Sequence, residues 1–500
     1  MTGMATLAAN LFLGIDVGGS VVKAAVFSDR GQEIACGRFP LGTVSTAPGR
    51  NERDLEGIWT AVCTAIRQVI DRVPGGAHRI AAIACVGHGN GLYLLDRTLR
   101  QVRPGIVSSD TRGDALLDEM AQHSAARAIT QRRGQRFGGS EPALLMHWLD
   151  QHEPDARDRT AHVLFCKDYI RFRLTNTLGT DLFDATGAGL VVRGTQSWDE
   201  ASLLALELGP WAAKLPPIQN SFDIAGTVTP DCAAATGLRV GTPVAVGTMD
   251  LEAVTFAMGS IDPNHFAIAS GTWNLGMVIV DTFRSVEQPL MQSRCHGDRA
   301  TLISAGSPTG VGNVSWLLGE VFGQAQPDWP EIERQLAQAR PERAGPIYLP
   351  QINGQAGRPQ AGFMGVTGMT SRHDLMTAVY QSAAFIHRQS RAEIERLTTN
   401  RLSLAKLSGA AAKSPVWSQI IADVLAMPVE TSAGSEEGAL GCAIVAAIAC
   451  GRFPSLASAV AAMTRPEKRF EPRAEFLDHF EYRFTRFQKL QEALAPWWAS

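Results

Sequence analysis

Two short glycine-bearing turns, each between two apolar runs, constrain the fold of this chain more than any other feature. The first turn is Gly18-Gly19-Ser20, between the predicted strands Leu11–Val17 and Val21–Phe27. The second is Ser270-Gly271-Thr272, between His265–Ala269 and Leu275–Val280. Strand, tight turn and strand predict a β-hairpin in each case. The turns lie about 250 residues apart, which predicts an internal duplication into two similar domains. The alternative is that glycine-rich hairpins are simply common.

The length of the chain also favours two domains, because 500 residues exceed what one hydrophobic core usually organises. We place an N-terminal domain at 10–260, a C-terminal domain at 261–465 and a C-terminal helical extension at 466–500. Strands and helices alternate in both halves, which predicts an α/β fold. The further elements expected are a strand at Gln32–Gly37, a helix capped by Asp54, strands at Ile80–Val86 and Leu404–Leu407, and helices at Ser371–Leu397, Pro415–Leu425, Glu437–Ala447 and Glu475–Trp497.

Composition excludes several classes of protein. The net charge is -3, so we expect no nucleic-acid partner, and the aromatic residues of the last helix are interpreted as packing residues. The eight cysteines form no CxxC pair, which predicts free thiols in a reducing compartment. The N-terminus resembles no signal peptide and no run of 18 apolar residues occurs, so we expect a cytoplasmic protein without a membrane partner.

Three glycine-rich segments, around Gly18, Gly271 and Gly310, have the composition of phosphate-binding turns. Glycine lets the backbone approach an anion closely, and the N–H groups of such a turn can hold it. No Walker A sequence is present, and the first turn is followed by a strand rather than a helix, so it is not a dinucleotide fingerprint. Lys23 follows Ser20 closely enough to reach the same phosphates. The alternative for Gly310 is a plain turn glycine.

Two aspartates follow predicted strands and have the chemistry that phosphoryl transfer needs. Asp16 ends the first strand and is a candidate for holding Mg²⁺ through water, or alternatively a turn stabiliser. Asp250 follows the strand Val244–Thr248 and begins the helix Leu251–Met258. A carboxylate at a helix N-terminus is expected to keep a low pKa and to be a weak base. Alignment on the attacking hydroxyl matters more than basicity in this chemistry, so Asp250 is the candidate general base, with a helix cap as the alternative.

Polar residues after two other apolar stretches suit a polyhydroxylated ligand. His88 and Asn90 lie in the turn Gly87–Gly91, and Asp110 and Arg112 lie in Ser108-Ser109-Asp110-Thr111-Arg112. A carboxylate that accepts hydrogen bonds from two hydroxyl groups can orient a sugar. The alternative for Asp110 is a structural ion pair with Arg112.

Taken in order, these segments resemble the FGGY family of carbohydrate kinases over about residues 10–465. The first hairpin is similar to that family's first phosphate motif, which implies that Asp16, Gly18, Gly19, Ser20 and Lys23 surround Mg²⁺ and the nucleotide phosphates. Gly271 and Thr272 resemble the second phosphate motif. The segment Leu407–Trp417 resembles the adenosine motif, which implies that Gly409, Ala410 and Ser414 lie near the nucleotide. Relatives carry adjacent glycines where this chain has Gly409 followed by three alanines, and the added methyl groups crowd the nucleotide.

The resemblance implies a two-domain, actin-like (ribonuclease H-like) ATPase fold with ATP and Mg²⁺ bound in an interdomain cleft. Within the family, the segments Gly87–Asp96, Ser108–Arg112 and Lys167–Tyr169 are most similar to the L-xylulose kinase, or pentulose kinase, branch. The expected reaction is phosphorylation of a ketopentose at a terminal hydroxyl, by a homodimer. A polyol kinase of the erythritol or glycerol type is the first alternative. A nucleotide-responsive regulator on the same fold, without sugar chemistry, is the second.

Overall fold

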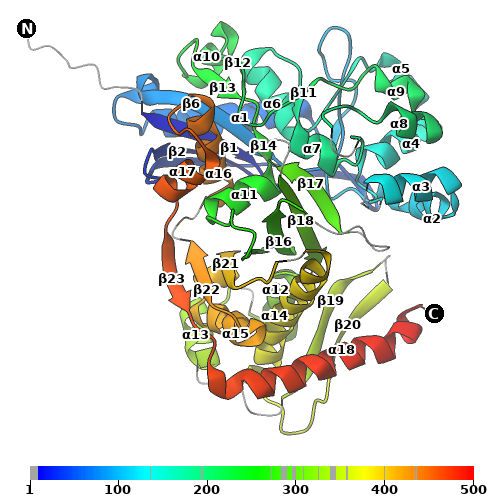
Figure 1. The fold of residues 1–500 in the computed structure, drawn as a ribbon, viewed down its shortest axis with the longest axis vertical. Helices are drawn as coiled ribbons and strands as arrows, with labels where there is room; N and C mark the ends of the chain where they lie inside the picture. The colour runs from blue at the N-terminus through cyan, green and yellow to red at the C-terminus, as the bar shows by residue number, and fades with distance from the viewer. Residues whose placement is uncertain are drawn as a thin grey trace, which may run out of the picture. The chain divides into compact units, whose positions relative to one another are not determined.

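The computed structural model describes residues 10–133, 135, 137–192, 195–271, 273–282, 290–295, 300–307, 309–324, 326–337, 345–355, 358–398, 400–432, 434 and 436–499 (Figure 1). The chain divides into two compact units. Unit 1 comprises Met1–Gly259, Ser285–Leu302 and Gly434–Thr464, and unit 2 comprises Ser260–Arg284, Ile303–Ala433 and Arg465–Ser500. Breaks between the units lie at Gly259/Ser260 and Thr464/Arg465, next to the boundaries at 260 and 465 that we place along the chain, but the segments Ser285–Leu302 and Gly434–Thr464 belong to unit 1.

The central sheet of unit 1 has the strand order β12-β13-β6-β1-β2-β3. β1 (Leu11–Val17) and β2 (Val21–Ser28) form the first predicted hairpin, and β3 (Glu33–Pro40) continues it antiparallel. β6 (Ile80–Gly87) lies parallel to β1, and β13 (Pro243–Ala245) lies parallel to β6. β12 (Ile224–Thr227) closes the far edge antiparallel to β13.

Helices cover both faces of this sheet. Leu13, Ile15 and Val17 of β1 belong to one apolar core with residues of α1 (Leu55–Ile70), and Asp54 caps α1 as predicted, accepting a hydrogen bond from Gly57 N at 2.7 Å. Successive residues of a strand point to opposite faces. The alternate residues of β1 accordingly meet α16 (Glu437–Ala449), where a Cβ on Gly14 would overlap the Ala439 backbone.

The predicted strand Val244–Thr248 is split in two. β13 ends at Ala245, and β14 (Thr248–Met249) pairs separately with β6. Gly247 lies between them at φ +83°, where an added Cβ would overlap the Cys85 carbonyl oxygen, so only glycine suits this bend. The bend leads directly into α11 (Asp250–Ala257).

The remaining elements of unit 1 surround this sheet. The small sheets pair β4 (Val44–Ala47) with β5 (Arg50–Arg53) and β8 (Gly105–Ile106), β7 (Tyr93–Leu95) with β9 (His162–Leu164), and β10 (Thr180–Asp181) with β11 (Ile218–Gln219). The helices are α2 (Leu117–Gln122), α3 (Ser124–Arg133), α4 (Pro142–His152), α5 (Pro154–Arg159), α6 (Cys166–Thr175), α7 (Leu182–Gly187), α8 (Glu200–Ala205), α9 (Gly209–Ala212), α10 (Pro230–Thr236) and α17 (Leu456–Met463).

Unit 2 repeats the strand arrangement of unit 1, which confirms the predicted duplication. β15 (His265–Ser270) and β16 (Asn274–Val280) form the second hairpin, and β21 (Leu404–Gly409) lies parallel to β15. β22 (Val429–Ser432) is parallel to β21, and β23 (Pro466–Phe470) is antiparallel to β22. β18 (Ala300–Ser307) lies on the other side of β16. Across each sheet, the hairpin is therefore followed by two strands parallel to its first strand and then by one antiparallel strand.

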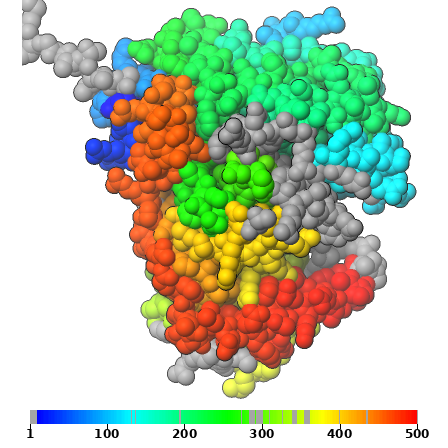
Figure 2. Space-filling model, viewed as in Figure 1, coloured from blue at the N-terminus to red at the C-terminus, as the bar shows by residue number. Residues whose placement is uncertain are grey.

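The helices of unit 2 include α12 (Gly312–Trp316), α13 (Trp329–Ala337), α14 (Arg372–Leu397) and α15 (Pro415–Leu425), and β19 (Ile347–Gln355) pairs with β20 (Arg358–Met364). The C-terminal helix α18 (Leu477–Ala499) runs along the surface of this unit, in red in Figure 2. Its Phe480, Phe484 and Phe487 are buried, which confirms their interpretation as packing residues, whereas Tyr482 is 62% exposed and does not fit that interpretation.

The structure bears on two predictions made from composition, one on the cysteines and one on membrane-spanning segments. The seven cysteines whose side chains the structure describes are free thiols. Within the described ranges, none of the helices combines the length and apolarity that a membrane crossing requires.

Candidate functional site

The turn of the first hairpin is open to solvent and is held from behind. Gly18 N donates to Val21 O at 3.2 Å, and the Gly19 and Ser20 residues are exposed. Arg53, which is 3% exposed, donates to Gly18 O at 3.2 Å and to Gly19 O. The two carbonyl groups of the turn are therefore fixed by a buried guanidinium group. A turn held this way is preorganised, because its backbone does not have to order when an anion binds.

Asp16 and Lys23 are paired across the hairpin, and the carboxylates of Glu436 and Glu437 act on the pKa of both. They are paired in the β1–β2 register, and Lys23 Nζ lies 3.0 Å from the Glu436 carboxylate, which also pairs with Arg38. Burial raises the pKa of Asp16 to about 6; Lys23 lowers it, and the negative charges of Glu436 and Glu437 raise it. The hydrogen bond to Glu436 helps raise the pKa of Lys23 despite its partial burial, so Lys23 is a cation at neutral pH.

The small residues of α16 let it pack directly on the strand and helix that carry the two aspartates. A Cβ on Gly438 would lie 2.5 Å from Asp16 Oδ2, and a Cβ on Gly441 would overlap the Ala253 backbone of α11. The sequence predicts close packing for this helix, and these contacts confirm it. Glycine is required at 441 because the backbones of α16 and α11 meet there, and at 438 because the Asp16 carboxylate lies where a Cβ would be.

Asp250 is the first residue of α11 and is half-buried. Its Oδ1 accepts a hydrogen bond at 2.8 Å from Leu251 N in the first turn of α11, whereas Met249 at the N-cap position makes no side-chain capping bond. The carboxylate therefore binds a helix N–H, as the capping alternative predicts, but from the first helical residue. The expected low pKa is wrong. Loss of water around the carboxylate, and then the negative charge of Asp16, raise the pKa of Asp250 to about 6. Desolvation outweighs the hydrogen bond from Leu251, which lowers the pKa.

His88 is buried and has a partner at each ring nitrogen. Nδ1 lies 3.1 Å from Gly89 O, which can only accept, and Nε2 lies 2.9 Å from the Tyr93 hydroxyl. The neutral tautomer that fits both contacts carries its proton on Nδ1 and accepts from Tyr93. Burial lowers the pKa of His88, which agrees with a neutral ring. Asn90, two residues on, is half-buried at φ +57° in the left-handed region that asparagine tolerates.

Asp110 and Arg112 form the ion pair that the sequence analysis left open. Arg112 donates from Nε to Asp110 Oδ1 and from a terminal nitrogen to Oδ2, both at 2.8 Å. Asp110 also accepts from Asn51 N at 2.7 Å, and Arg112 contacts Glu52 at 2.6 Å. Oδ1 accepts in addition from Arg112 N at 2.9 Å, so each aspartate oxygen accepts two hydrogen bonds within the protein. The carboxylate therefore has no free lone pair for a sugar hydroxyl in this conformation, and its role in binding a sugar stays a prediction.

In unit 2, the glycines of the predicted nucleotide motifs converge at one end of the sheet. Val311 N donates to Gly271 O at 2.8 Å, and Ala410 N donates to Ser270 O at 2.8 Å. These two bonds join the second hairpin turn to the segments that carry Gly310 and Gly409. Gly409 lies at φ +83°, and an added Cβ would overlap the Ser270 backbone.

Ser414 lies in the adenosine-type segment and stabilises the helix that begins after it. Its hydroxyl accepts a hydrogen bond from Trp417 N at 3.0 Å and so caps α15. Ala410 is exposed beside Gly409, where a ligand can reach it. Thr272, the remaining residue of the predicted nucleotide set, lies outside the described residues.

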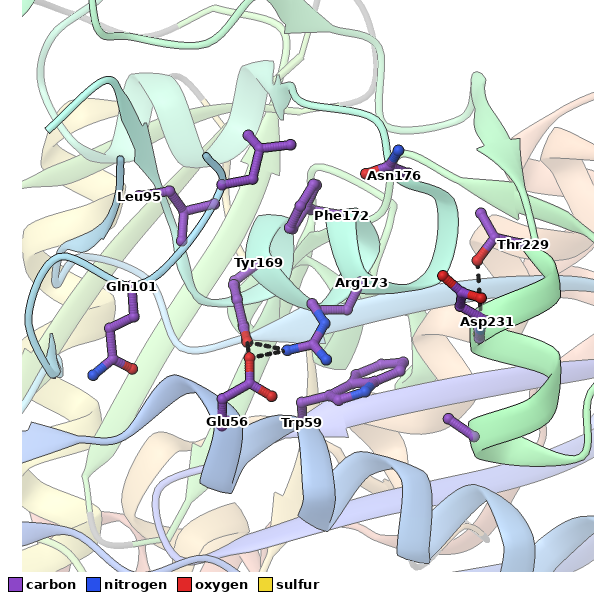
Figure 3. Close-up of a pocket in the computed structure, with 13 residues that line it drawn as sticks. Glu56, Trp59, Leu95, Gln101, Tyr169, Phe172, Arg173, Asn176, Thr229 and Asp231 are labelled. Carbon is purple, nitrogen blue, oxygen red and sulfur yellow. Dashed lines mark hydrogen bonds and ion pairs between the residues drawn. The ribbon is translucent and has the colours of Figure 1, made fainter. Parts of the chain in front are cut away.

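A separate pocket of about 460 Å³ in unit 1 contains none of the predicted site residues (Figure 3). Three of its polar groups bind one another: Arg173 pairs with Glu56 at 2.5 Å, donates to the Tyr169 hydroxyl at 2.7 Å and lies over the Trp59 ring at 4.8 Å. Nothing in this network points to a missing partner.

Two residues of the site escape the sequence analysis. Glu436 has a recognisable signal, since it is an acidic residue at the start of a helix rich in glycine and alanine. Arg53 has none, because its guanidinium reaches the Gly18-Gly19 turn only through the fold. Asp16, Lys23, His88 and Asp250, in contrast, are brought into one electrostatically linked group in unit 1, as their mutual effects on pKa show.

Comparison with known proteins gives one family over most of the chain. Residues 11–257 match the N-terminal domain, and residues 266–450 the C-terminal domain, of the FGGY family of carbohydrate kinases. The L-xylulose/3-keto-L-gulonate kinase of Escherichia coli (strain K12) is 28% identical over 487 residues, covering 97% of each chain. The erythritol kinase of Brucella abortus (strain 2308) is 26% identical over 514 residues, covering 98% of this chain and 97% of the relative.

A solved structure shows the same fold. The xylulose kinase from Rhodospirillum rubrum superposes with a TM-score of 0.89 at 23% identity, covering 98% of this chain and all of the other. The chain therefore has the two-domain, actin-like ATPase fold that the sequence predicts.

Proposed function

Because the chain belongs to the FGGY family of carbohydrate kinases, we propose that it transfers the terminal phosphoryl group of ATP to a terminal hydroxyl of a ketopentose, with L-xylulose as the first candidate. Family membership makes it a carbohydrate kinase, whose ligands are a sugar and ATP. The identity of the sugar and the roles of the individual residues are the content of the proposal. The observation that carries it is the half-buried, solvent-reachable Asp250 with its raised pKa.

Asp250 receives the proton of the attacking hydroxyl. A base with a pKa of about 6 is ionised at pH 7.5 and accepts a proton more readily than a carboxylate at its ordinary value of 3.8. The raised pKa therefore makes Asp250 a stronger base than the weakly basic carboxylate that the sequence predicts. The Leu251 N–H holds Oδ1 and leaves the second carboxylate oxygen for the hydroxyl proton. Aligned bases of this kind typically contribute 10²–10⁴-fold to the rate.

The hairpin turns hold phosphate groups. In unit 1, Gly18, Gly19 and Ser20 form an exposed turn braced by Arg53, and Lys23 adds a positive charge. In unit 2, Gly271, Gly310 and Gly409 lie on hydrogen-bonded neighbouring loops, with Ala410 exposed beside them. We assign the first group to the transferred phosphate and the second to the nucleotide.

The carboxylate of Asp16 fits a magnesium ion. Burial raises its pKa to about 6, so a divalent cation beside it would favour the ionised form. Among the described residues, no cluster of three or more acidic, histidine or cysteine side chains could hold a metal by itself. Magnesium in phosphoryl-transfer enzymes commonly uses one or two carboxylates together with substrate phosphates. When bound, it neutralises charge on the transferring phosphates.

The sugar is oriented by His88, Asn90, Asp110 and Arg112. The neutral His88 and the amide of Asn90 offer polar groups without net charge, and the Asp110–Arg112 pair keeps its geometry through Glu52. A polyol kinase is the second candidate, favoured by the similarity to an erythritol kinase over nearly the full length. We also propose that the enzyme is a homodimer, which light scattering after size-exclusion chromatography tests.

A coupled assay of ADP release tests the proposal. D- and L-xylulose, D- and L-ribulose, erythritol and glycerol are compared at equal ATP. We expect L-xylulose to have the highest kcat/KM by tenfold or more, and Asp250→Asn to lose 10²–10⁴ in kcat with that sugar. A higher kcat/KM with erythritol or glycerol would replace the substrate with a polyol. Turnover of Asp250→Asn within twofold of the unmodified enzyme would remove Asp250 from the reaction.

A further inference from the structure

A second pocket, of about 260 Å³, lies within unit 2 between helices α13, α14 and α15 and the C-terminal segment. Its walls are mainly apolar, with Ile420, Phe470 and Phe480 among them. Two of its polar side chains are already paired. Arg473 binds Asp423 through two nitrogens, and Gln419 Nε2 donates to Asp423 at 2.9 Å.

Two further polar groups of this pocket have no partner. Gln381 is 2% exposed, and within the described part of the chain its Oε1 has no hydrogen bond. Thr377 lies four residues earlier on α14, and its Oγ1 is equally buried and without a partner there. Residues four apart on a helix share one face, so both groups belong to the same wall of the pocket. Buried polar groups are nearly always paired, and leaving one unpaired is costly.

The pocket of Figure 3 provides the contrast. It is larger, but its arginine, glutamate and tyrosine bind one another, whereas the smaller pocket combines an apolar lining with an unmatched amide. Unmatched groups in an apolar recess are the arrangement of ligand sites, in which a few polar atoms orient a mostly apolar molecule.

We propose that this pocket binds a small planar molecule carrying a carboxamide or lactam group. Such a group pairs with a primary amide through one N–H donor and one carbonyl acceptor, which matches the two kinds of polar atom on Gln381. The Thr377 hydroxyl supplies a further donor or acceptor. The ring of the ligand covers the apolar wall formed by Phe470 and Phe480. The site holds no residue of the predicted nucleotide or sugar sets.

Binding at this site changes nucleotide affinity, a consequence that rests on the proposed function. Pro415 and Val416 line the pocket and belong to the adenosine-type segment Leu407–Trp417, directly after Ser414. They form the first turn of α15, which Ser414 caps through the Trp417 N–H. A ligand that contacts this turn restricts the loop from Gly409 to Ser414. Coupling between the two sites is reciprocal, so the nucleotide must change ligand affinity by the same factor.

Calorimetric titration with benzamide, without sugar or nucleotide, tests the site. We expect saturable binding that weakens at least tenfold in Gln381→Met, a change that keeps side-chain length and suits a helix. Gln389→Met is the matched control: Gln389 lies on the same helix but pairs with Gln491, so its replacement must leave benzamide affinity unchanged. N,N-dimethylbenzamide lacks N–H donors and must bind at least tenfold more weakly. Absence of saturable binding up to the solubility limit, or equal affinity in Gln381→Met, overturns the site.

The affinity for ADP with and without saturating benzamide tests the coupling. We expect a change of at least threefold in the unmodified enzyme and none in Gln381→Met. An unchanged ADP affinity in the unmodified enzyme overturns the coupling. A protein that binds benzamide but phosphorylates no sugar would refute the proposed function instead, because the titration uses neither substrate.

Discussion

Replacement of Asp250 by asparagine is expected to stabilise the protein while removing its activity. The pKa of this carboxyl is about 6 in the folded chain and 3.8 as an ordinary side chain, so the folded state binds its proton more tightly. Keeping the group ionised above pH 6 therefore costs stability, and the cost is relieved as the pH falls from 6 towards 3.8. A difference of about 2 pKa units corresponds to about 3 kcal/mol. Because Asp250 is half-buried and solvent screens part of this, we expect about 1–2 kcal/mol.

The assay is urea unfolding of the unmodified protein and Asp250→Asn, at pH 7.5 and at pH 4. Asparagine keeps the oxygen that accepts from Leu251, so the packing is preserved. The variant should be more stable at pH 7.5, and the difference should shrink at pH 4. Asp231→Asn serves as control, since Asp231 is an exposed acid in the first turn of α10, where its charge favours the helix. A variant that is less stable than the unmodified protein at pH 7.5 would refute the reasoning.

Three further predictions concern the nucleotide side of the site. Gly409→Ala places a side chain at φ +83° against Ser270, so isothermal titration should show ADP affinity reduced at least tenfold; unchanged affinity would contradict the role of this bend. Glu436→Gln removes the charge that pairs with Lys23, and steady-state kinetics should show a KM for ATP raised about three- to tenfold, with a smaller effect on the KM for the sugar. Chelation of divalent cations by EDTA should abolish turnover and Mg²⁺ should restore it, and metal-independent turnover would remove the assigned role of Asp16 towards magnesium.

The sequence predicts those parts of the fold that depend on local pattern. The hairpins around Gly18 and Gly271, the cap at Asp54 and the close packing of the small-residue helix around Gly438 all follow from residue type and spacing. The split strand before Asp250 does not, because the bend at Gly247 is set by the neighbouring Cys85 backbone, which is distant in sequence.

The chemistry of the site depends on neighbours that a linear pattern does not contain. The low pKa expected for Asp250 considers only its own helix, whereas burial and the charge of Asp16 come from other elements. In the same way, Arg53 reaches the phosphate-type turn only through the fold. The site residues themselves are recognisable as types; their electrostatic state is a property of the tertiary structure.

The pH dependence of kcat/KM for the unmodified enzyme tests most directly whether Asp250 accepts the sugar proton. With a pKa of about 6, the carboxylate is about 9% ionised at pH 5 and about 91% at pH 7, so kcat/KM should fall about tenfold between these values. A profile that stays flat from pH 7 down to pH 5 would contradict the account.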